Sequence, residues 1–105
     1  MARLDGIRAK VAQRQYEFSQ HAVDRSIRRG ISVAEVEEAI AGPSAVIEDC
    51  PDAKYGPSCL VLGFTAAGRP LHIVCSHPSR PRVKIITLYE PKPEAWDNWR
   101  VRRAV

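Results

Sequence analysis

One histidine and three arginines are spaced so that they share one face of a short helix predicted for residues 20–29. At about 100° per residue, the helical positions of Arg25, Arg28 and Arg29 fall within about 80° of His21. His21 lies in the first turn, where free N–H groups and the helix dipole favour a neutral imidazole. A neutral histidine can accept a proton, and neighbouring arginines can hold a phosphate group. The spacing therefore predicts a phosphate-binding surface in which His21 is the proton acceptor.

The same residues also fit a solvated amphipathic helix without chemistry. Val23 and Ile27 fall on the side opposite the basic residues, which is the usual division of a surface helix. Asp24 offsets part of the positive charge, and exposed ion pairs of this kind contribute little to stability. The residue pattern leaves both interpretations open.

Three further candidates lie on segments whose alternating pattern is that of β-strands. His72 is a second candidate for proton transfer, Lys84 a phosphate-binding candidate, and Tyr89 a candidate for stacking or proton transfer. Each has a structural alternative. His72 would be a hydrogen-bonded strand histidine, Lys84 a hairpin-end charge, and Tyr89 an aromatic residue of the core or its rim.

The expected strand pairing decides whether His72 is exposed. With a tight first hairpin, His72 lies opposite Gly63, whose missing side chain would open a groove and expose the imidazole. The second hairpin is expected to pair Ile73 with Thr87. The sheet face turned to the core would then consist of Leu60, Leu62, Phe64, Leu71, Ile73, Cys75, Ile85 and Thr87.

Metal ligands and cofactor motifs show no recognised spacing. The chain holds three histidines and three cysteines, and Cys75 and His77 would point to the same face of a strand, but the other candidates follow no ligand pattern. The sequence has no Gly-rich phosphate loop, GxSxG elbow or glycosidase-type carboxylate pair. We therefore expect neither a metal nor a cofactor.

Caps and turn residues predict the helices that would position these side chains. An apolar stripe at residues 2–14 predicts an amphipathic helix that either docks on the core or extends from it. A brief extended segment follows at residues 16–18. Ser19 caps the next helix, which should stop at Gly30. The last helix of this region is predicted to begin with an S-x-x-E capping box at Ser32 and to end at the Gly-Pro pair of residues 42 and 43.

From residue 45 the periodicity becomes that of strands. Turn-rich segments at residues 51–57, 66–69 and 78–82 separate four strands, at residues 45–49, 58–65, 70–77 and 83–90. Residues 91–103 are predicted to form a helix, because Trp96 and Trp99 would share one of its faces.

The fold class is therefore α+β, a single antiparallel sheet of about four strands with two leading helices and a closing C-terminal helix. We expect an N-terminal helical extension at residues 1–15 and one domain at residues 16–105.

Composition narrows the class of partner. The 105 residues suffice for one core, and the formal charge of +4 with a pI near 9.3 favours an anionic partner. The odd cysteine count without CxxC spacing, and the lack of a leading apolar run, are typical of a cytoplasmic protein. No apolar stretch approaches membrane-spanning length, so we expect no membrane partner.

Two motifs stand out in the chain: residues 21–32 follow the pattern H-A-x-x-R-x-x-x-R-G-I-S, and residues 87–91 follow the pattern T-x-Y-x-P. Together they resemble the signature of a bacterial family known as domain of unknown function four-two-five-eight. The resemblance runs from about residue 16 to residue 100. This family resembles the RelE-like toxins, whose order of elements is similar to the one predicted above.

The resemblance implies a toxin-type endoribonuclease with RNA and an antitoxin protein as partners. Such enzymes cleave RNA without a metal, by attack of the ribose 2′-OH on the adjacent phosphate. The catalytic residues would be His21, His72 and Tyr89, and Arg25, Arg28, Arg29 and Lys84 would hold the RNA phosphate. Two alternatives remain: a noncatalytic module that binds nucleic acid or an acidic protein through the basic helix, and a structural zinc protein.

Overall fold

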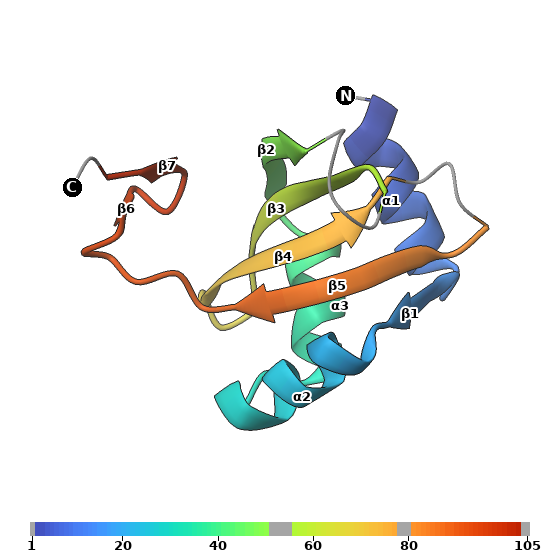
Figure 1. Cartoon of the computed structure of the whole chain (residues 1–105), viewed down its shortest axis with the longest axis horizontal. Coiled ribbons are helices and arrows are strands. Elements are labelled where there is room, and N and C mark those ends of the chain that lie inside the picture. The colour runs from blue at the N-terminus through green and yellow to red at the C-terminus, as the bar shows by residue number, and fades with distance from the viewer. Residues whose placement is uncertain (1, 51–55, 78–80, 104–105) are drawn as a thin grey trace.

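The computed structural model describes residues 2–50, 56–77 and 81–103, so parts of two predicted turns, at residues 51–55 and 78–80, lie outside it. Helices cover one face of a sheet, and the C-terminal segment lies beyond the end of the last long strand (Figure 1). In chain order the elements are α1 (Ala2–Ala12), β1 (Tyr16–Phe18), α2 (Gln20–Arg29), α3 (Val33–Ala41), β2 (Ser44–Cys50), β3 (Ser58–Phe64), β4 (Pro70–Ser76), β5 (Val83–Tyr89), β6 (Trp96–Asp97) and β7 (Val101–Arg102).

The predicted boundaries of α2 and α3 are confirmed. The Ser19 side chain accepts the Ala22 N–H at 3.0 Å, and Gly30 ends α2 in the left-handed conformation with φ of 62°. The capping box of α3 is present in both directions, since Ser32 accepts the Glu35 N–H and the Glu35 carboxylate accepts the Ser32 N–H. These caps act within a few residues, which is why the sequence alone predicted them.

The prediction of a single antiparallel sheet of about four strands is wrong. The main sheet has five strands in the order β1-β5-β4-β3-β2, and it is mixed because β1 pairs in parallel with β5. The backbone of β1 continues into this pairing at both ends: the Val83 N–H donates to Gln15 O at 3.0 Å and the Ser19 N–H donates to Ile85 O at 2.9 Å. A segment of only three residues does not predict which strand it pairs with. Here β1 pairs with β5 because the edge of β5 has unpaired backbone N–H and C=O groups.

The predicted register of the first hairpin is wrong by one residue. Phe64 pairs with Pro70, and the Thr65 N–H bonds to the Arg69 carbonyl at 2.9 Å, which leaves a three-residue loop with Gly68 at φ of +88°. Ile73 therefore lies opposite Val61 instead of Leu62. A one-residue slip turns a whole strand over, so Leu60, Leu62 and Phe64 point away from the helices, contrary to the expected core face.

The second hairpin also departs from the expected pairing. Ile73 lies opposite Leu88, not Thr87, and the register shifts between the pairs that Val74 and Cys75 form with β5. This β-bulge inserts an extra residue at Ile86, and Leu88 takes the buried position that was expected for Thr87.

Gly63 lies against α3 instead of flooring an open groove. A Cβ added at Gly63 would lie 2.2 Å from the carbonyl oxygen of Ala39. The missing side chain therefore serves the close approach of helix to sheet. The predicted groove above Gly63 is absent from the described face, and the prediction that it exposes His72 is wrong.

The predicted closing helix is also wrong, because the segment after β5 forms a small hairpin of β6 and β7. Asn98 and Trp99 have φ of 53° and 66°, and the Arg100 N–H closes the turn on the Asp97 carbonyl at 3.0 Å. Positive φ at both central residues is the signature of a type I′ turn and is incompatible with a helix. The i, i+3 spacing of the two tryptophans therefore did not reflect a helical face.

The N-terminal helix docks on the core, which was one of its two predicted arrangements. Ile7 is fully buried, Val11 is 5% exposed, and Arg8 donates to the Ala41 carbonyl at 2.6 Å. These contacts hold α1 against α3. Within the described residues, no helix is long and apolar enough to cross a membrane.

Candidate functional site

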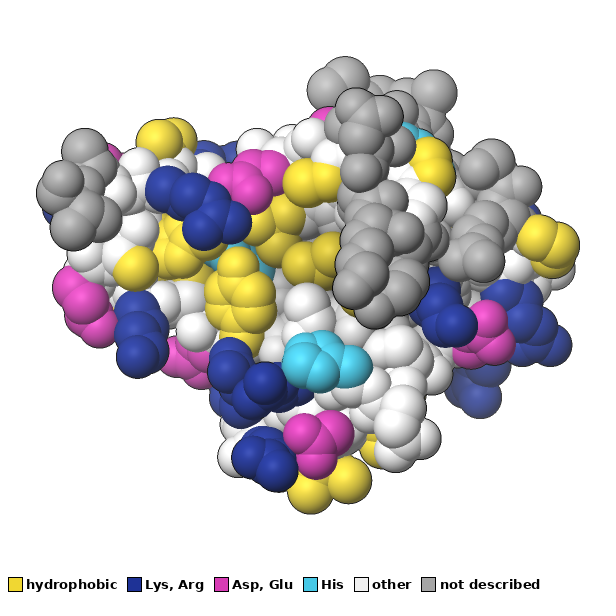
Figure 2. Space-filling model, in the orientation of Figure 1, with side chains coloured by type: hydrophobic (Ala, Val, Ile, Leu, Met, Phe, Trp, Pro, Cys, Tyr) yellow, Lys and Arg dark blue, Asp and Glu magenta, His cyan; other side chains and the backbone are white. Residues whose placement is uncertain are grey.

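The basic surface of α2 consists of His21, Arg25, Arg28 and Arg29. All four side chains reach solvent, with Arg25 half-buried and the others exposed. Arg25 Nε donates to His21 Nε2 at 3.4 Å, and Arg28 Nε lies 3.1 Å from the carboxylate of Asp24. Because a guanidinium only donates, His21 Nε2 is the acceptor of this bond. Figure 2 shows Lys, Arg and His side chains gathered over α2.

The helix rests on the sheet through a small residue, not through its larger apolar ones. Ala22 is fully buried, whereas Val23 is 38% exposed and Ile27 is 75% exposed. The Ser19 hydroxyl, which caps α2, also donates to the Ile86 carbonyl at 2.7 Å and ties the start of the helix to β5. The basic surface consequently lies along the edge of the sheet beside β5.

His72 is buried, and both of its ring nitrogens have partners. Nε2 lies 2.7 Å from the Trp99 carbonyl oxygen, and Nδ1 lies 3.1 Å from the Tyr89 hydroxyl. A carbonyl only accepts, so Nε2 carries the proton and Nδ1 accepts the hydrogen bond from Tyr89. Burial lowers the pKa of His72 below its usual value, although the bond to Trp99 acts in the opposite direction. His72 is thus a neutral residue of the interior.

The hairpin of β6 and β7 covers His72. The Trp96 ring meets the imidazole edge to face, with centroids 4.3 Å apart and an interplanar angle of 89°. The Arg102 guanidinium lies over the Trp96 ring, 4.7 Å from its centroid, and holds the Glu48 carboxylate at 2.9 and 3.2 Å. Sequence reasoning missed this cover because it predicted a helix at residues 91–103.

Tyr89 connects the buried histidine to the basic surface of α2. Its hydroxyl bonds to His72, and the Arg29 guanidinium lies over its ring at 5.8 Å from the centroid. Burial raises the pKa of the Tyr89 hydroxyl, which therefore stays protonated and can donate to His72. Tyr89 itself is half-buried. The structure thus groups His21, Arg25, Arg28, Arg29 and Tyr89 on one surface and leaves His72 beneath it.

Comparison with known families matches most of the chain to a described family. The model of the family "Domain of unknown function (DUF4258)" matches residues 18–90. The chain belongs to this family. The DUF4258 match includes α2, β4 and β5, and therefore all seven predicted site residues, but it stops before β6 and β7. No curated protein and no solved structure matches the chain, so the likeness to RelE-like toxins stays a prediction.

Lys84 lies apart from the other cations of the DUF4258 segment. It occupies the same face of β5 as Tyr89 but is five residues away, or about 17 Å along an extended strand. The Lys84 backbone N–H donates to the Ser76 hydroxyl at 2.8 Å, and the residue pairs with Glu17 of β1. Lys84 can extend the basic surface of α2, but it cannot share one phosphate group with Arg29.

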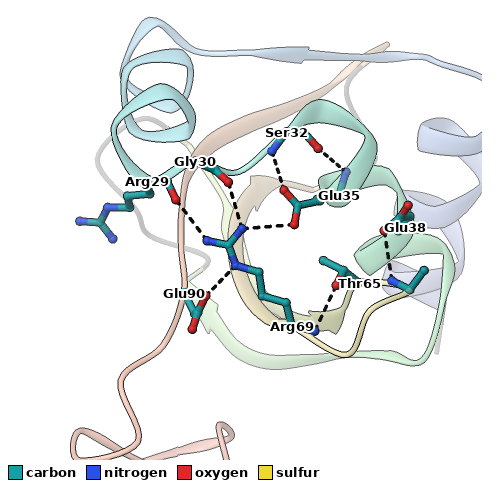
Figure 3. A network of polar contacts seen from close by, with 9 residues as sticks. Arg29, Gly30, Ser32, Glu35, Glu38, Thr65, Arg69 and Glu90 are labelled. Atoms are coloured by element: carbon teal, nitrogen blue, oxygen red, sulfur yellow. Dashed lines mark hydrogen bonds and ion pairs between the residues drawn. The ribbon is translucent and has the colours of Figure 1, made fainter.

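Arg69 holds the end of α2 against the sheet of the DUF4258 fold (Figure 3). Its guanidinium donates to the carbonyl oxygens of Arg29 at 3.1 Å and Gly30 at 3.0 Å. The same group binds the carboxylates of Glu35 at 3.2 Å and Glu90 at 2.6 Å. Four partners from three parts of the chain meet at one side chain. A single arginine in a turn gave no sequence signal for this role.

Potential metal ligands of the DUF4258 chain are engaged elsewhere. His77 Nε2 lies 3.0 Å from Asp49, and Cys75 is buried opposite Cys59. A hydrogen bond with Cys59, and after it burial, raise the pKa of the Cys75 thiol. Within residues 2–50, 56–77 and 81–103, no three His, Cys, Asp or Glu side chains gather into a metal site.

Proposed function

We propose that this protein binds RNA through the basic surface of α2. The observation that carries the proposal is the grouping of Arg25, Arg28 and Arg29 with His21 on one solvent-facing surface. Residues one helical turn apart have Cβ atoms about 5–6 Å apart, so Arg25 and Arg29 can reach one phosphate or two neighbouring ones. Guanidinium groups match phosphate geometry, and the net charge of +4 favours the approach of a polyanion.

RNA cleavage is a second candidate function, and the contact between Arg25 and His21 favours it. If Arg25 turns to a bound phosphate, His21 Nε2 loses its donor and becomes free to accept a proton. His21 would take the proton of the 2′-OH, the 2′ oxygen would form a bond to phosphorus, and the bond to the 5′ oxygen would break. The leaving oxygen would take a proton from water, and the product would carry a 2′,3′-cyclic phosphate.

In this proposal His72 has no contact with RNA, because it is fully buried. Lys84 would hold a phosphate farther along the RNA. Tyr89 lies beside Arg29. An antitoxin protein as partner stays part of the proposal only through the likeness to RelE-like toxins.

Binding and cleavage can be tested in one experiment with EDTA present. Labelled single-stranded RNA is titrated with wild type and with the double variant Arg25→Ala/Arg29→Ala, and affinity is read by fluorescence anisotropy. The matched control is Lys92→Ala/Arg100→Ala, which removes the same charge from two exposed side chains outside the surface. We expect the first variant to weaken binding at least about 10-fold and the control to change it less than about threefold.

Cleavage is measured in the same samples under single-turnover conditions. Removal of a general base by His21→Ala should slow the reaction by roughly 100- to 10,000-fold with little change in affinity. Equal binding by both double variants would refute the proposed surface. If the wild type binds RNA but does not cleave it, the proposed binding function stands and the proposed cleavage is refuted.

A further inference from the structure

We propose that the ring of Tyr89 is a binding subsite for an unpaired nucleobase, which makes single-stranded RNA the preferred ligand of the basic surface of α2. This inference rests on the proposed function, because it assumes that the surface binds RNA. It adds the class of RNA and the group that selects it.

The surroundings of Tyr89 fit a base better than a phosphate alone. Its ring lies at the end of β5 on the sheet face turned away from the helices, and Arg29 lies over the ring at 5.8 Å from the centroid. Unstacked bases in RNA complexes stack on tyrosine rings and on guanidinium planes. In Figure 2, hydrophobic side chains over the end of β5 adjoin the Lys and Arg side chains over α2.

Buried contacts hold the Tyr89 ring in place before any ligand arrives. The Tyr89 hydroxyl donates to His72 Nδ1 at 3.1 Å, and His72 Nε2 donates to the Trp99 carbonyl at 2.7 Å. Trp96, on the hairpin of β6 and β7, packs against the imidazole of His72. A ring that is already ordered loses less conformational entropy on binding. His72 is therefore a positioning residue for Tyr89 in this proposal.

The arrangement selects against duplex RNA. In a duplex the bases are paired and stacked on their neighbours, and the deep, narrow major groove excludes side chains. A base that leaves the strand to stack on Tyr89 brings its own phosphate toward Arg29 and Arg25, which are one helical turn apart. Base and phosphate recognition would thus occur together on adjacent elements, β5 and α2.

The test compares three probes of equal length by fluorescence anisotropy: a single-stranded RNA, the same backbone without bases, and duplex RNA. Wild type should bind the base-containing strand about 5- to 150-fold more tightly than the baseless backbone, which is the range for one stacked base. Tyr89→Leu should reduce this ratio to near one, and its affinity for the baseless backbone should not change. Tyr89→Phe keeps the ring and should keep most of the ratio.

Tyr16→Leu is the matched control, because Tyr16 is another half-buried tyrosine whose hydroxyl bonds to Glu37 on α3. It should leave the ratio unchanged, and thermal unfolding checks that every variant is folded. Should Tyr89→Leu fail to fold, the ratio of wild type and of Tyr89→Phe decides the result.

The outcomes separate the two proposals. Equal affinity of wild type for all three probes would overturn the nucleobase subsite and leave RNA-backbone binding in place. No binding to any probe would overturn the proposed function. An acidic peptide that binds as tightly as the base-containing strand, and loses affinity equally in Arg25→Ala/Arg29→Ala, would show a general anion surface for proteins and also overturn the subsite.

Discussion

His72 and Tyr89 form a hydrogen-bonded pair, and the surroundings of the pair determine which atom carries each proton. The Trp99 carbonyl holds the proton on Nε2 of His72, so Nδ1 is an acceptor and the Tyr89 hydroxyl is its donor. Burial favours the neutral form of both groups. The pair is therefore expected to remain uncharged at neutral pH and to lose its hydrogen-bond pattern only when His72 takes up a proton.

The low pKa of His72 predicts that mild acid lowers the free energy of unfolding. Below the usual histidine pKa of 6.5, the unfolded chain binds a proton that the folded protein does not. The free energy of unfolding should therefore fall as the pH drops from about 7.5 through 6.5, by at most about 1.4 kcal/mol per pH unit. Urea unfolding between pH 8 and pH 5 measures this slope.

His72→Asn provides the control, because Asn offers an oxygen near the position of Nδ1 but does not titrate. The slope between pH 7.5 and pH 5 should be smaller in this variant. A slope equal to that of wild type would mean that another group causes the acid sensitivity.

At the scale of elements, the C-terminus of α2 depends on a side chain from the β3–β4 turn. Arg69 binds two carbonyl oxygens at the end of α2 and two carboxylates, one at the start of α3 and one just after β5 (Figure 3). The pKa of Glu35 is lowered, chiefly because the Ser32 N–H donates to it, with Arg69 adding a further contribution. This network keeps Arg29 beside Tyr89.

Replacing Arg69 with methionine should lower the free energy of unfolding by about 2 kcal/mol. Hydrogen bonds to charged groups contribute about 1.5–3 kcal/mol, and the Arg69 side chain is 27% exposed, which weakens them. The control Arg28→Met breaks an exposed pair with Asp24 and should cost less than about 0.5 kcal/mol. Denaturant unfolding of both variants compares the two losses. Equal losses would contradict a special role of Arg69.

The close packing of α3 on β3 predicts a large effect of Gly63→Ala. The new Cβ would lie 2.2 Å from the Ala39 carbonyl oxygen, which is backbone and cannot rotate away. Overpacking of this kind costs about 1–3 kcal/mol, and we expect the upper end of the range. The thermal midpoint of unfolding is the measurement. An unchanged midpoint would show that helix and sheet separate more easily than their packing indicates.

At the scale of the whole molecule, one sheet face is buried under three helices and the proposed ligand surface lies at the edge of that layer (Figure 1). The β1 strand extends the sheet beyond β5, and α2 follows β1 directly, so the chain carries the basic surface of α2 to the end of β5 where Tyr89 lies. The rigid sheet thereby sets the relative position of phosphate-binding and aromatic groups.

The charge of this surface predicts a salt-dependent affinity for RNA. Each phosphate neutralised on a single strand contributes a slope of about −0.7 to log K against log salt concentration. Three arginines should therefore give a slope near −2, and Arg25→Ala should reduce its magnitude by about 0.7. Titrations at several KCl concentrations measure it. A slope near zero would exclude phosphate contacts as the source of affinity.

The sequence by itself determined the helices α2 and α3, the four long strands and the clustering of His21, Arg25, Arg28 and Arg29 on one helix face. The signals for these features act over one or two turns: a cap at Ser19, a left-handed glycine at Gly30, or a 3.6-residue period. Such local preferences need no knowledge of the rest of the chain.

Only the tertiary structure decided the strand register, the partner of β1, the C-terminal hairpin and the burial of His72. A one-residue slip reverses every side chain of a strand, and the slip here depended on the loop at Gly68, the bulge at Ile86 and the contact of Gly63 with α3. Each of these joins residues that are distant in sequence or depends on a turn conformation. The burial of His72 depends on such long-range contacts, because residues 96–102 cover it. A pattern confined to residues 70–76 cannot predict that cover.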